Sequence, residues 1–536
     1  MKNEHLRAIH IPFKNTGFFS KTMLDYLEQQ TRIRAFYQNP PNFKGFAKQL
    51  KQKQASYNKT TRINLHKAIS EQYTELNTTE LSRVNMAKLL RINTFTITTG
   101  HQLNLFTGPL YFLYKIISTI NLCEEMTKHF PDKNFVPVYW MATEDHDFDE
   151  VNFFNFNGKK VQWNSNQTGS VGRFITRGLN EVLAVFSEHL GSSKNAEYLK
   201  SLFYTAYVKH SNLADATRYL VNELFGHYGL LIIDPDKPEL KRELMPYLEY
   251  ELFYQTSYKE VSKTTSDLSK FYKIQVNPRQ LNLFYLKDGL RERIILKNEL
   301  YKVNNTDMCF SKKEIRKELD QFPERFSPNV IVRPLYQEII LPNLCYIGGG
   351  GELAYWLQLK AYFDAVSVPF PILMLRSSIQ ILPKKQEKKL KKLEISLEQL
   401  FAKQSNLIKL KLAENADFDI DFNEQKQFLK TQFAKLRLIA QKTDVSFIGA
   451  VDAQEKKQLK GLANLEKRLL RAEKRKKFDL VNRINSLQNE IFPNEVLEER
   501  QRNFSEYYLK YGTSFISNLK ASINPLKPNF TVLVMD

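Results

Sequence analysis

The sequence has few cysteines and no long apolar run. Its three cysteines, Cys123, Cys309 and Cys345, are too few and too far apart for a disulfide framework. No stretch approaches the ~18 consecutive apolar residues of a membrane-spanning helix. The segment Met1–Pro12 carries charges where a secretory signal has its apolar core. We therefore expect a cytoplasmic protein.

Signatures of metal and nucleotide binding are also missing. The sequence has neither Cys-x-x-Cys nor His-Glu-x-x-His, so a four-ligand structural zinc is not expected. The glycine run 348–351 is not followed by the Lys-Ser/Thr of a Walker A motif, and it does not fit Gly-x-Gly-x-x-Gly. We expect no metal beyond a Mg²⁺ that accompanies a nucleotide, with a His/Asp/Glu site as the alternative.

Charge is abundant and unevenly placed. Of the 536 residues, 42% are hydrophobic and 25% charged, which is typical of a globular protein, and the net charge is +20. A basic surface suits nucleic acid, membrane headgroups or anionic substrates, but a lysine-rich composition has the same effect. The segment Lys384–Glu490 holds 25 basic and 15 acidic residues, which is half of the excess in about a fifth of the chain.

That basic segment has the pattern of long helices. No proline occurs between Pro383 and Pro493, and leucines recur at steps of three and four in two stretches. We predict an antiparallel coiled-coil hairpin that serves homodimerisation, with an acidic turn at Asn415–Asn423. The basic run Arg468–Lys477 is interpreted as a solvated face, so nucleic acid is not expected as a partner. The seam residues are Leu390, Leu393, Leu397, Leu400, Gln404 and Leu407, then Leu459, Leu462, Leu465, Leu469, Ala472, Leu480, Ile484, Leu487 and Ile491.

The rest of the chain alternates strand-like and helical patterns. Phe95–Thr99 and Phe135–Met141 are β-branched and aromatic, and an amphipathic helix runs between them from Pro109 to about Lys128. Strand, helix and strand at this spacing predict a β-α-β unit in a parallel, Rossmann-like α/β sheet. Further strands of the same sheet are expected at 230–233, 331–332, 345–347 and 371–375.

Polar or glycine-rich segments follow four of these expected strands. In open parallel sheets, ligands bind outside the carboxyl ends of the strands, so these segments are expected to meet at one site. They supply the candidates for substrate and nucleotide binding: Gly100, His101, Gln102, Thr107, Gly108, Gly348, Gly349, Gly350, Gly351, Glu352, Tyr355, Arg376, Ser377 and Ser378.

The densest ionisable cluster, Glu144, Asp145, His146 and Asp147, is the candidate catalytic group. Carboxylates that flank an imidazole can provide a general base or orient a histidine. The alternative is a helix N-terminus that carries acids. Glycines before a helix expose N–H groups to an anion, although a tight turn explains them too. Arg376 suits an anion, with a structural salt bridge as the alternative.

Three motifs resemble the BshC family, the cysteine-adding ligases of bacillithiol biosynthesis. They are the segments 99–117, with Thr-Gly-His-Gln-Leu-Asn-Leu-Phe-Thr-Gly-Pro-Leu-Tyr and Tyr-Lys-Ile-Ile, 137–151, with Thr-Glu-Asp-His-Asp, and 346–360, with Tyr-Ile-Gly-Gly and Glu-Leu-Ala-Tyr-Trp. The resemblance covers nearly the whole chain, including the basic segment and the strand-like 530–534.

The resemblance implies a core related to class I aminoacyl-tRNA synthetases, connecting insertions and a coiled-coil dimerisation domain. It also implies condensation of cysteine with the amine of glucosaminyl-malate, with ATP as the expected activator of the carboxylate. Backbone N–H groups near Thr107 and Gly108, with His101, would then hold a phosphate or malate group, and Arg376 would suit the malate. The expected domains are a mainly helical part at 1–94, the catalytic core with its insertions at 95–382, the coiled-coil arm at 383–491, and a segment returning to the core at 492–536.

Two other functions fit the same pattern. One is a nucleotide- or amino-acid-binding paralogue without ligase activity, because a fold does not determine a function. The other is a tRNA-related ligase, which the basic arm and the synthetase likeness suggest. A purely structural coiled-coil dimer would leave the polar strand ends unexplained.

Overall fold

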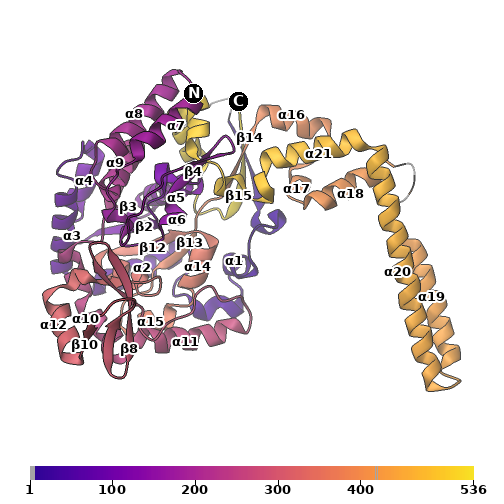
Figure 1. Cartoon of the computed structure of the whole chain (residues 1–536), viewed down its shortest axis with the longest axis horizontal. Coiled ribbons are helices and arrows are strands. Elements are labelled where there is room, and N and C mark those ends of the chain that lie inside the picture. Colours follow the sequence, from indigo (N-terminus) through magenta and orange to yellow (C-terminus); the bar gives the residue numbers. More distant parts are fainter. Residues whose placement is uncertain (1–5, 417, 419) are drawn as a thin grey trace. The chain divides into compact units, whose positions relative to one another are not determined.

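The chain divides into two compact units (Figure 1). The computed structural model describes residues 6–416, 418 and 420–536. The first unit holds the residues up to 14, residues 18–381 and residues 498–533. The second unit holds residues 15–17, 382–497 and 534–536. Within the described residues, no helix is both long enough and apolar enough to cross a membrane.

A five-stranded parallel sheet forms the centre of the first unit, in the order β13-β12-β2-β3-β6. α5 (Tyr111–His129) connects the neighbours β2 and β3, so the predicted β-α-β unit and the Rossmann-like sheet are confirmed. Buried side chains of α5, β2, β3, β12 and β13 form one apolar core, as expected for a parallel sheet covered by helices. The strands are β2 (Thr94–His101), β3 (Asn134–Met141), β6 (Leu231–Ile233), β12 (Asn343–Gly348) and β13 (Ile372–Leu375).

The strand expected at 331–332 is wrong. These two residues are a turn that leads into α13 (Arg333–Ile340). The Asn329 carboxamide accepts hydrogen bonds from the backbone N–H of Ile331 at 2.8 Å and of Val332 at 3.3 Å. Pro334 sits in the first turn of the helix, where its missing N–H costs nothing. The side-chain cap and the proline therefore overrode the β-branched pair.

The long insertion between β6 and β12 carries an antiparallel sheet in the order β10-β9-β8-β7-β11. The hairpin β7–β8 turns at Asp288–Gly289, and Gly289 has φ +72°, which suits a tight turn. The strands are β7 (Leu283–Lys287), β8 (Leu290–Lys297), β9 (Leu300–Val303), β10 (Cys309–Phe310) and β11 (Phe326–Pro328).

Helices surround these sheets in the first unit (Figure 1). The N-terminal part is mainly helical after one strand, β1 (Arg7–Pro12). Strand β15 (Asn529–Met535) covers the strand-like segment predicted at 530–534, and it lies between β1 and β14 (Ile379–Pro383) in a three-stranded sheet. A short hairpin joins β4 (Phe153–Phe156) and β5 (Lys159–Gln162). The remaining helices are α1 (Lys21–Leu27), α2 (Phe43–Ser56), α3 (Lys59–Gln72), α4 (Glu80–Lys88), α6 (Phe148–Val151), α7 (Leu179–Leu190), α8 (Lys194–Val208), α9 (Leu213–Phe225), α10 (Pro238–Tyr254), α11 (Thr256–Ser269), α12 (Lys312–Gln321), α14 (Gly350–Trp356), α15 (Lys360–Ala365), α22 (Phe504–Tyr511) and α23 (Ser514–Ser522).

The second unit contains an antiparallel coiled-coil hairpin, as predicted, but its turn lies at 441–444 and not at 415–423, and its first helix lies outside the two predicted seams. It is formed by α19 (Asn423–Ala440) and α20 (Val445–Lys476), which lie side by side in Figure 1. The chain reverses at 441–444, where the Asp444 side chain caps α20. The turn predicted at 415–423 lies partly outside the described residues, at 417 and 419, and its other residues separate α18 from α19. The second leucine seam falls on α20 and on α21 (Phe478–Ile491).

The first leucine seam is not one helix, which corrects the prediction for 390–407. The structure has three short helices there, α16 (Lys384–Lys392), α17 (Leu397–Leu400) and α18 (Gln404–Glu414). Ser396 and Gln399 form a capping box that starts α17, and Glu394 has φ +52°, which a continuing helix does not allow. The heptad spacing is present, but local capping breaks the helix.

Candidate functional site

A cavity of about 610 Å³ lies at the carboxyl ends of β2, β3 and β12, in the first unit. The strand ends contribute Gly100, Trp140 and Tyr346, and the antiparallel sheet contributes Phe284 and Arg291 as the facing wall. β2 and β3 pair in register from Thr94–Asn134 to His101–Met141. This register places the segments after the two strands next to each other, as the sequence predicted.

Asp145 is a fixed and ionised carboxylate in this cavity. Its Oδ2 accepts a hydrogen bond from Gln102 Nε2 at 2.8 Å, and its Oδ1 accepts one from the backbone N–H of His146 at 2.8 Å. Burial by itself raises the pKa of Asp145, but the hydrogen bonds of His146 and Gln102 and the charge of Arg291 outweigh it and hold the pKa well below its usual range. Asp145 can therefore bind a cation, but it is a weak base.

His146 is held by Arg291. Arg291 Nη1 lies 2.7 Å from His146 Nδ1, and a guanidinium can only donate, so Nδ1 accepts and carries no proton. Arg291 is fixed in turn by hydrogen bonds to Ser327 Oγ at 3.2 Å and to the carbonyl oxygen of Pro328 at 3.4 Å. In neutral His146 the proton is then on Nε2, which makes this side chain a hydrogen-bond donor to the cavity.

Glu144 is not free to bind a ligand, because its carboxylate is already paired. Its carboxylate forms a buried ion pair with Lys241, which also donates to the carbonyl oxygen of Phe326 at 2.9 Å. Burial raises the pKa of Glu144, and the Lys241 charge opposes that rise. This buried pair joins the loop after β3 to α10 and to the start of β11.

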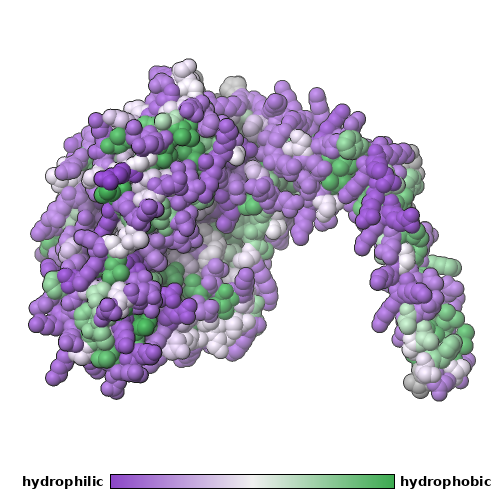
Figure 2. All heavy atoms as spheres, in the orientation of Figure 1, coloured by the Kyte–Doolittle hydropathy of each residue, from purple (hydrophilic) through white to green (hydrophobic). Residues whose placement is uncertain are grey.

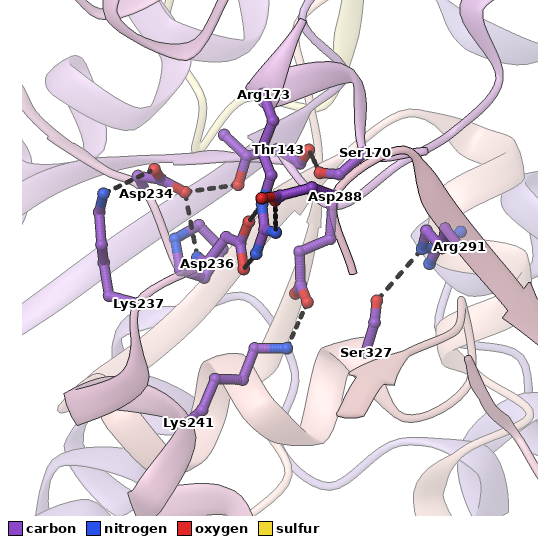
Figure 3. Close-up of polar contacts among 12 residues, drawn as sticks. Thr143, Ser170, Arg173, Asp234, Asp236, Lys237, Lys241, Asp288, Arg291 and Ser327 are labelled. Carbon is purple, nitrogen blue, oxygen red and sulfur yellow. Dashed lines mark hydrogen bonds and ion pairs between the residues drawn. The ribbon is translucent and has the colours of Figure 1, made fainter. Parts of the chain in front are cut away.

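A network of polar contacts fixes the loop after β3 (Figure 3). Thr143 Oγ1 donates to Asp234 at 2.5 Å, and Ser170 Oγ donates to the carbonyl oxygen of Thr143 at 2.5 Å. Arg173 reaches Asp236 with Nε at 2.9 Å and Nη2 at 3.1 Å, and its Nη1 reaches Asp288 at 2.9 Å. Because Asp288 is at the tip of the β7–β8 hairpin, this arginine anchors the hairpin that carries Arg291. The sequence gives no signal for these contacts, since their partners are far apart in the chain.

Lys115 and Glu352 form the floor of the cavity. The Glu352 carboxylate accepts hydrogen bonds from Lys115 Nζ at 2.7 and 2.8 Å, from the Tyr346 hydroxyl at 2.6 Å and from the backbone N–H of Gly349 at 3.1 Å. Burial raises the pKa of Glu352, but Lys115 and these hydrogen bonds lower it by a larger amount, so the pKa lies below its usual value. The sequence prediction missed Lys115, although a lysine within an apolar helical face is a signal for a buried partner.

His101 is neutral. Burial and the charge of Lys115 lower the pKa of His101 to about 3, and its buried Nε2 has no hydrogen-bond partner among the described residues. The ring packs against Tyr111 and Phe112 at centroid distances of 5.4 and 5.1 Å.

The predicted site residues divide into two groups. Eight of them line the cavity: Gly100, His101, Gln102, Glu144, Asp145, His146, Glu352 and Tyr355. The others are not part of its lining: Asp147, Thr107, Gly108, Gly348, Gly349, Gly350, Gly351, Arg376, Ser377 and Ser378.

Arg376, Gly108 and Gly349, which lie outside the lining, have partners within the protein. The Arg376 guanidinium is paired with buried Glu499 at 2.8 and 3.0 Å. The carbonyl oxygens of Phe106 and Gly108 accept from Asn503 Nδ2 at 2.7 and 2.6 Å. Glu352 already occupies the backbone N–H of Gly349. A role in ligand binding stays a prediction for this group.

Comparison with known proteins gives matches over the whole chain. A family model described as "Bacillithiol biosynthesis BshC, N-terminal Rossmann-like domain" matches residues 6–377, and one described as "Bacillithiol biosynthesis BshC, C-terminal coiled-coil domain" matches residues 379–535. A protein of Flavobacterium johnsoniae named "Putative cysteine ligase BshC" is 53% identical over 98% of this chain and 99% of its own length. Proteins of the same name from Christiangramia forsetii and Cytophaga hutchinsonii are 51% and 38% identical over 98% and 96% of both chains.

A crystal structure from Campylobacter jejuni, described as a putative arginyl-tRNA synthetase, matches with 10% identity and a TM-score of 0.23. That match covers 84% of this chain and all of the other, and we draw nothing from so low a score. The two family models together span the Rossmann-like and the coiled-coil parts described above. The chain belongs to the BshC family of bacillithiol biosynthesis.

Proposed function

We propose that this protein is a cysteine ligase that joins L-cysteine to the amine of glucosaminyl-malate in the last step of bacillithiol biosynthesis. Membership of the BshC family and the names of its relatives support the ligase activity. The single observation that carries the proposal at the site is Asp145, an ionised carboxylate fixed in the cavity and open to an ammonium group. Both proposed substrates bring such a group.

We further propose that ATP activates the cysteine carboxylate. A carboxylate is a poor acyl donor, because its leaving group would be an oxide. Attack of a cysteine carboxylate oxygen on the α-phosphorus of ATP would displace pyrophosphate and form an acyl adenylate. The sugar amine would then form the C–N bond, AMP would leave with the C–O electrons, and the amine would release one proton. The unpartnered His101 Nε2 at the end of β2 supports a polar ligand group at that place.

Asp145 and His146 would have different roles in the reaction. Asp145 would bind an ammonium group, and His146 would donate a hydrogen bond from Nε2 towards an oxygen of the reacting carboxylate or phosphate. Neither side chain is set up as a strong base in this geometry, since Asp145 is held ionised and His146 Nδ1 is occupied by Arg291. The amine would therefore lose its proton to solvent or to a phosphate oxygen.

Mass spectrometry tests this function directly. Purified protein is incubated with L-cysteine, glucosaminyl-malate and Mg·ATP, and each component is omitted in turn. A product with one added cysteinyl unit, formed only with ATP and accompanied by AMP, is expected. The same product without ATP would support the ligase activity and contradict ATP as the activator of the carboxylate. No product in any mixture would remove the ligase and favour a ligand-binding paralogue.

We also propose that the protein forms a homodimer through the coiled-coil hairpin. The tip of the α19–α20 hairpin exposes apolar side chains, among them Leu438 and Ile439, which are 62% and 57% exposed. Figure 2 shows hydrophobic side chains gathered at that end of the hairpin. An exposed apolar patch on a soluble chain is typical of an interface.

A further inference from the structure

Arg333 is a partly buried cavity-lining cation that has no ion pair with a carboxylate of the described protein. It starts α13 and lines the cavity beside Tyr346 and Tyr355. Its Nη1 donates to the neutral Gln337 Oε1 at 3.2 Å. Burial lowers the pKa of Arg333, but the neighbouring Tyr355, Tyr346 and Glu352 raise it by more. Its buried Nη2 has no hydrogen-bond partner among the described residues. No carboxylate of the described chain lies within 4 Å of this guanidinium.

The other cations of the site show the contrast. Lys115 is paired with Glu352 at 2.7 Å, and Lys241 is paired with Glu144. Arg376 is paired with Glu499 at 2.8 Å. The three guanidinium nitrogens of Arg291 have acceptors: Ser327 Oγ for Nε, His146 Nδ1 for Nη1 and the Pro328 carbonyl oxygen for Nη2. Arg279 and Arg293 also line the cavity without an ion pair among the described residues, but both are exposed to solvent, so Arg333 is the unpaired guanidinium that is partly buried.

The surroundings of Arg333 make the absence of an anion energetically unfavourable. The rings of Trp140, Tyr346 and Trp356 lie 5.9, 5.7 and 6.0 Å from its Cζ. Aromatic faces attract a cation, but they do not replace the two acceptors that a guanidinium prefers. A buried charge without a partner is unfavourable, so an incoming anion gains more here than at an exposed arginine.

Gly100 keeps the approach to Arg333 open. A Cβ at this position would lie 3.6 Å from Arg333 Nη1 and 3.3 Å from the Tyr346 hydroxyl. The bare backbone at the end of β2 therefore leaves space between the strand and the guanidinium. Nη2 itself is screened from water, and the neighbouring Tyr355 side chain is only partly buried.

We propose that Arg333 binds a substrate carboxylate, with Tyr355 moving aside as the carboxylate enters. A carboxylate has the planar pair of oxygens and the single charge that match the uncompensated guanidinium. The inference rests on the proposed function, in which both substrates carry carboxylates: one on cysteine and two on the malyl group. It gives Arg333 the role that the sequence had suggested for Arg376, whose guanidinium Glu499 occupies.

Calorimetric titration of the full chain tests the inference with pairs of ligands. L-cysteine is compared with cysteamine, which lacks the carboxylate, and glucosaminyl-malate with methyl glucosaminide. Arg333→Gln is expected to lower the affinity for one carboxylate ligand by roughly ten- to a hundredfold. Its affinity for the matching ligand without the carboxylate should not change. Arg333→Lys is expected to recover part of the loss, since it keeps the charge but not the planar pair of donors.

The pairs of ligands also identify the source of the carboxylate. A loss confined to cysteine assigns its carboxylate to Arg333, and a loss confined to glucosaminyl-malate assigns the malyl group. Arg242→Gln removes an exposed charge on α10 outside the cavity and should change neither affinity. If Arg333→Gln does not fold, Arg333→Lys serves in the same comparison.

Failure of the inference is separable from failure of the proposed function. Wild-type affinities for both carboxylate ligands in folded Arg333 variants would overturn the inference and leave the ligase untouched. Free malate serves as a third probe. If the wild type binds malate through Arg333 but binds neither cysteine nor the glycoside, the carboxylate site stands and the proposed substrates fall. No carboxylate binding of any kind would overturn the inference.

Discussion

At the scale of single residues, the ionisable run after β3 does not act as a group. Glu144 is buried against Lys241, Asp145 faces the cavity, His146 accepts from Arg291, and Asp147 lies outside the lining. Consecutive residues of a loop point in different directions, so four neighbours in sequence meet four environments. Burial raises the pKa of Glu144, whereas the hydrogen bonds of His146 and Gln102 and the charge of Arg291 lower the pKa of Asp145, so two adjacent carboxyl groups shift in opposite directions.

Asp145→Asn should weaken binding of the amine-bearing substrate. The substitution keeps the shape and removes the charge that we assign to ammonium binding, so KM for that substrate is expected to rise roughly tenfold or more. Since the Asp145 side chain is partly exposed, the melting temperature should stay close to that of the wild type. Steady-state kinetics with each substrate varied in turn measure the effect. Asp149→Asn, an exposed neighbour on α6, is the matched control, and an unchanged KM in Asp145→Asn would remove this role.

Glu498 should make the stability of the first unit depend on pH. Burial raises the pKa of Glu498 to about 7, although the Arg502 charge and the Tyr507 hydroxyl oppose the rise. An unfolded glutamate titrates near pH ~4.3, so between that pH and 7 the folded chain keeps a proton that the unfolded chain has lost. The free energy of unfolding from this group is therefore full below pH ~4.3 and falls, by up to about 3 kcal/mol, as the pH rises through 7.

Glu498→Gln removes this titration. Urea unfolding at pH 5 and pH 8 is expected to show a smaller difference between the two pH values in the variant than in the wild type. Glu181→Gln, an exposed acid on α7, should keep the wild-type difference. Equal differences in Glu498→Gln and the wild type would mean that this carboxyl titrates normally in the fold.

At the scale of elements, hydrophobic periodicity predicted helices and strands correctly where residue propensity, capping and burial agree with it. β2, α5 and β3 combine strand propensity, a helix-starting proline and an apolar face, and all three lie where the sequence placed them. The strand at 331–332 and the seam at 390–407 failed because side-chain caps at Asn329 and Ser396 competed with the pattern. The Asn329 cap and the single capping box at Ser396 are weak signals in the sequence beside a hydrophobic repeat.

The site was predictable only in part, for a related reason. Gln102, Asp145 and Glu352 follow strands that the sequence identified, and the parallel sheet brings their strand ends together. Arg291 comes from an antiparallel sheet whose pairing with the cavity the sequence does not indicate. Arg333 starts α13, just after the residues 331–332 that the sequence prediction took for a strand. Long-range pairing of that kind leaves no periodic trace in a single sequence.

The turn between β2 and α5 should depend on Gly108. Phe106, Thr107 and Gly108 have φ of +47°, +69° and +61°, and a Cβ on Gly108 would lie 2.7 Å from Asn104 Cβ. Gly108→Ala is therefore expected to destabilise the first unit by about 1–3 kcal/mol.

Gly461 lies inside α20 with nothing within 4 Å of an added Cβ, so Gly461→Ala should stabilise its helix by about 0.5–1 kcal/mol. Chemical unfolding followed by circular dichroism measures both, and a neutral Gly108→Ala would show that the turn relaxes.

At the scale of the whole molecule, the two units bury apolar surface in different ways. The first unit surrounds a parallel sheet with helices, so its apolar side chains find partners within one chain. The α19–α20 hairpin has two layers only, and its core at the tip is the small group Phe433, Ala440 and Val451. A pair of helices covers one face of each, which leaves the opposite faces exposed. The hairpin is therefore the part of the chain whose stability gains most from a second copy.

Dimerisation through the hairpin tip should fail when its exposed apolar residues become polar. The triple variant Leu438→Gln, Ile439→Gln and Phe447→Ser changes side chains that are not part of that small core, so the hairpin itself should still fold. Light scattering after size exclusion is expected to give a dimer for the wild type and a monomer for the variant. Leu465→Gln, an exposed leucine of α20 farther from the turn, is the control and should stay dimeric. A monomeric wild type would remove the dimer, and a dimeric triple variant would move the interface elsewhere, because an apolar patch of this kind is the main driving force for association.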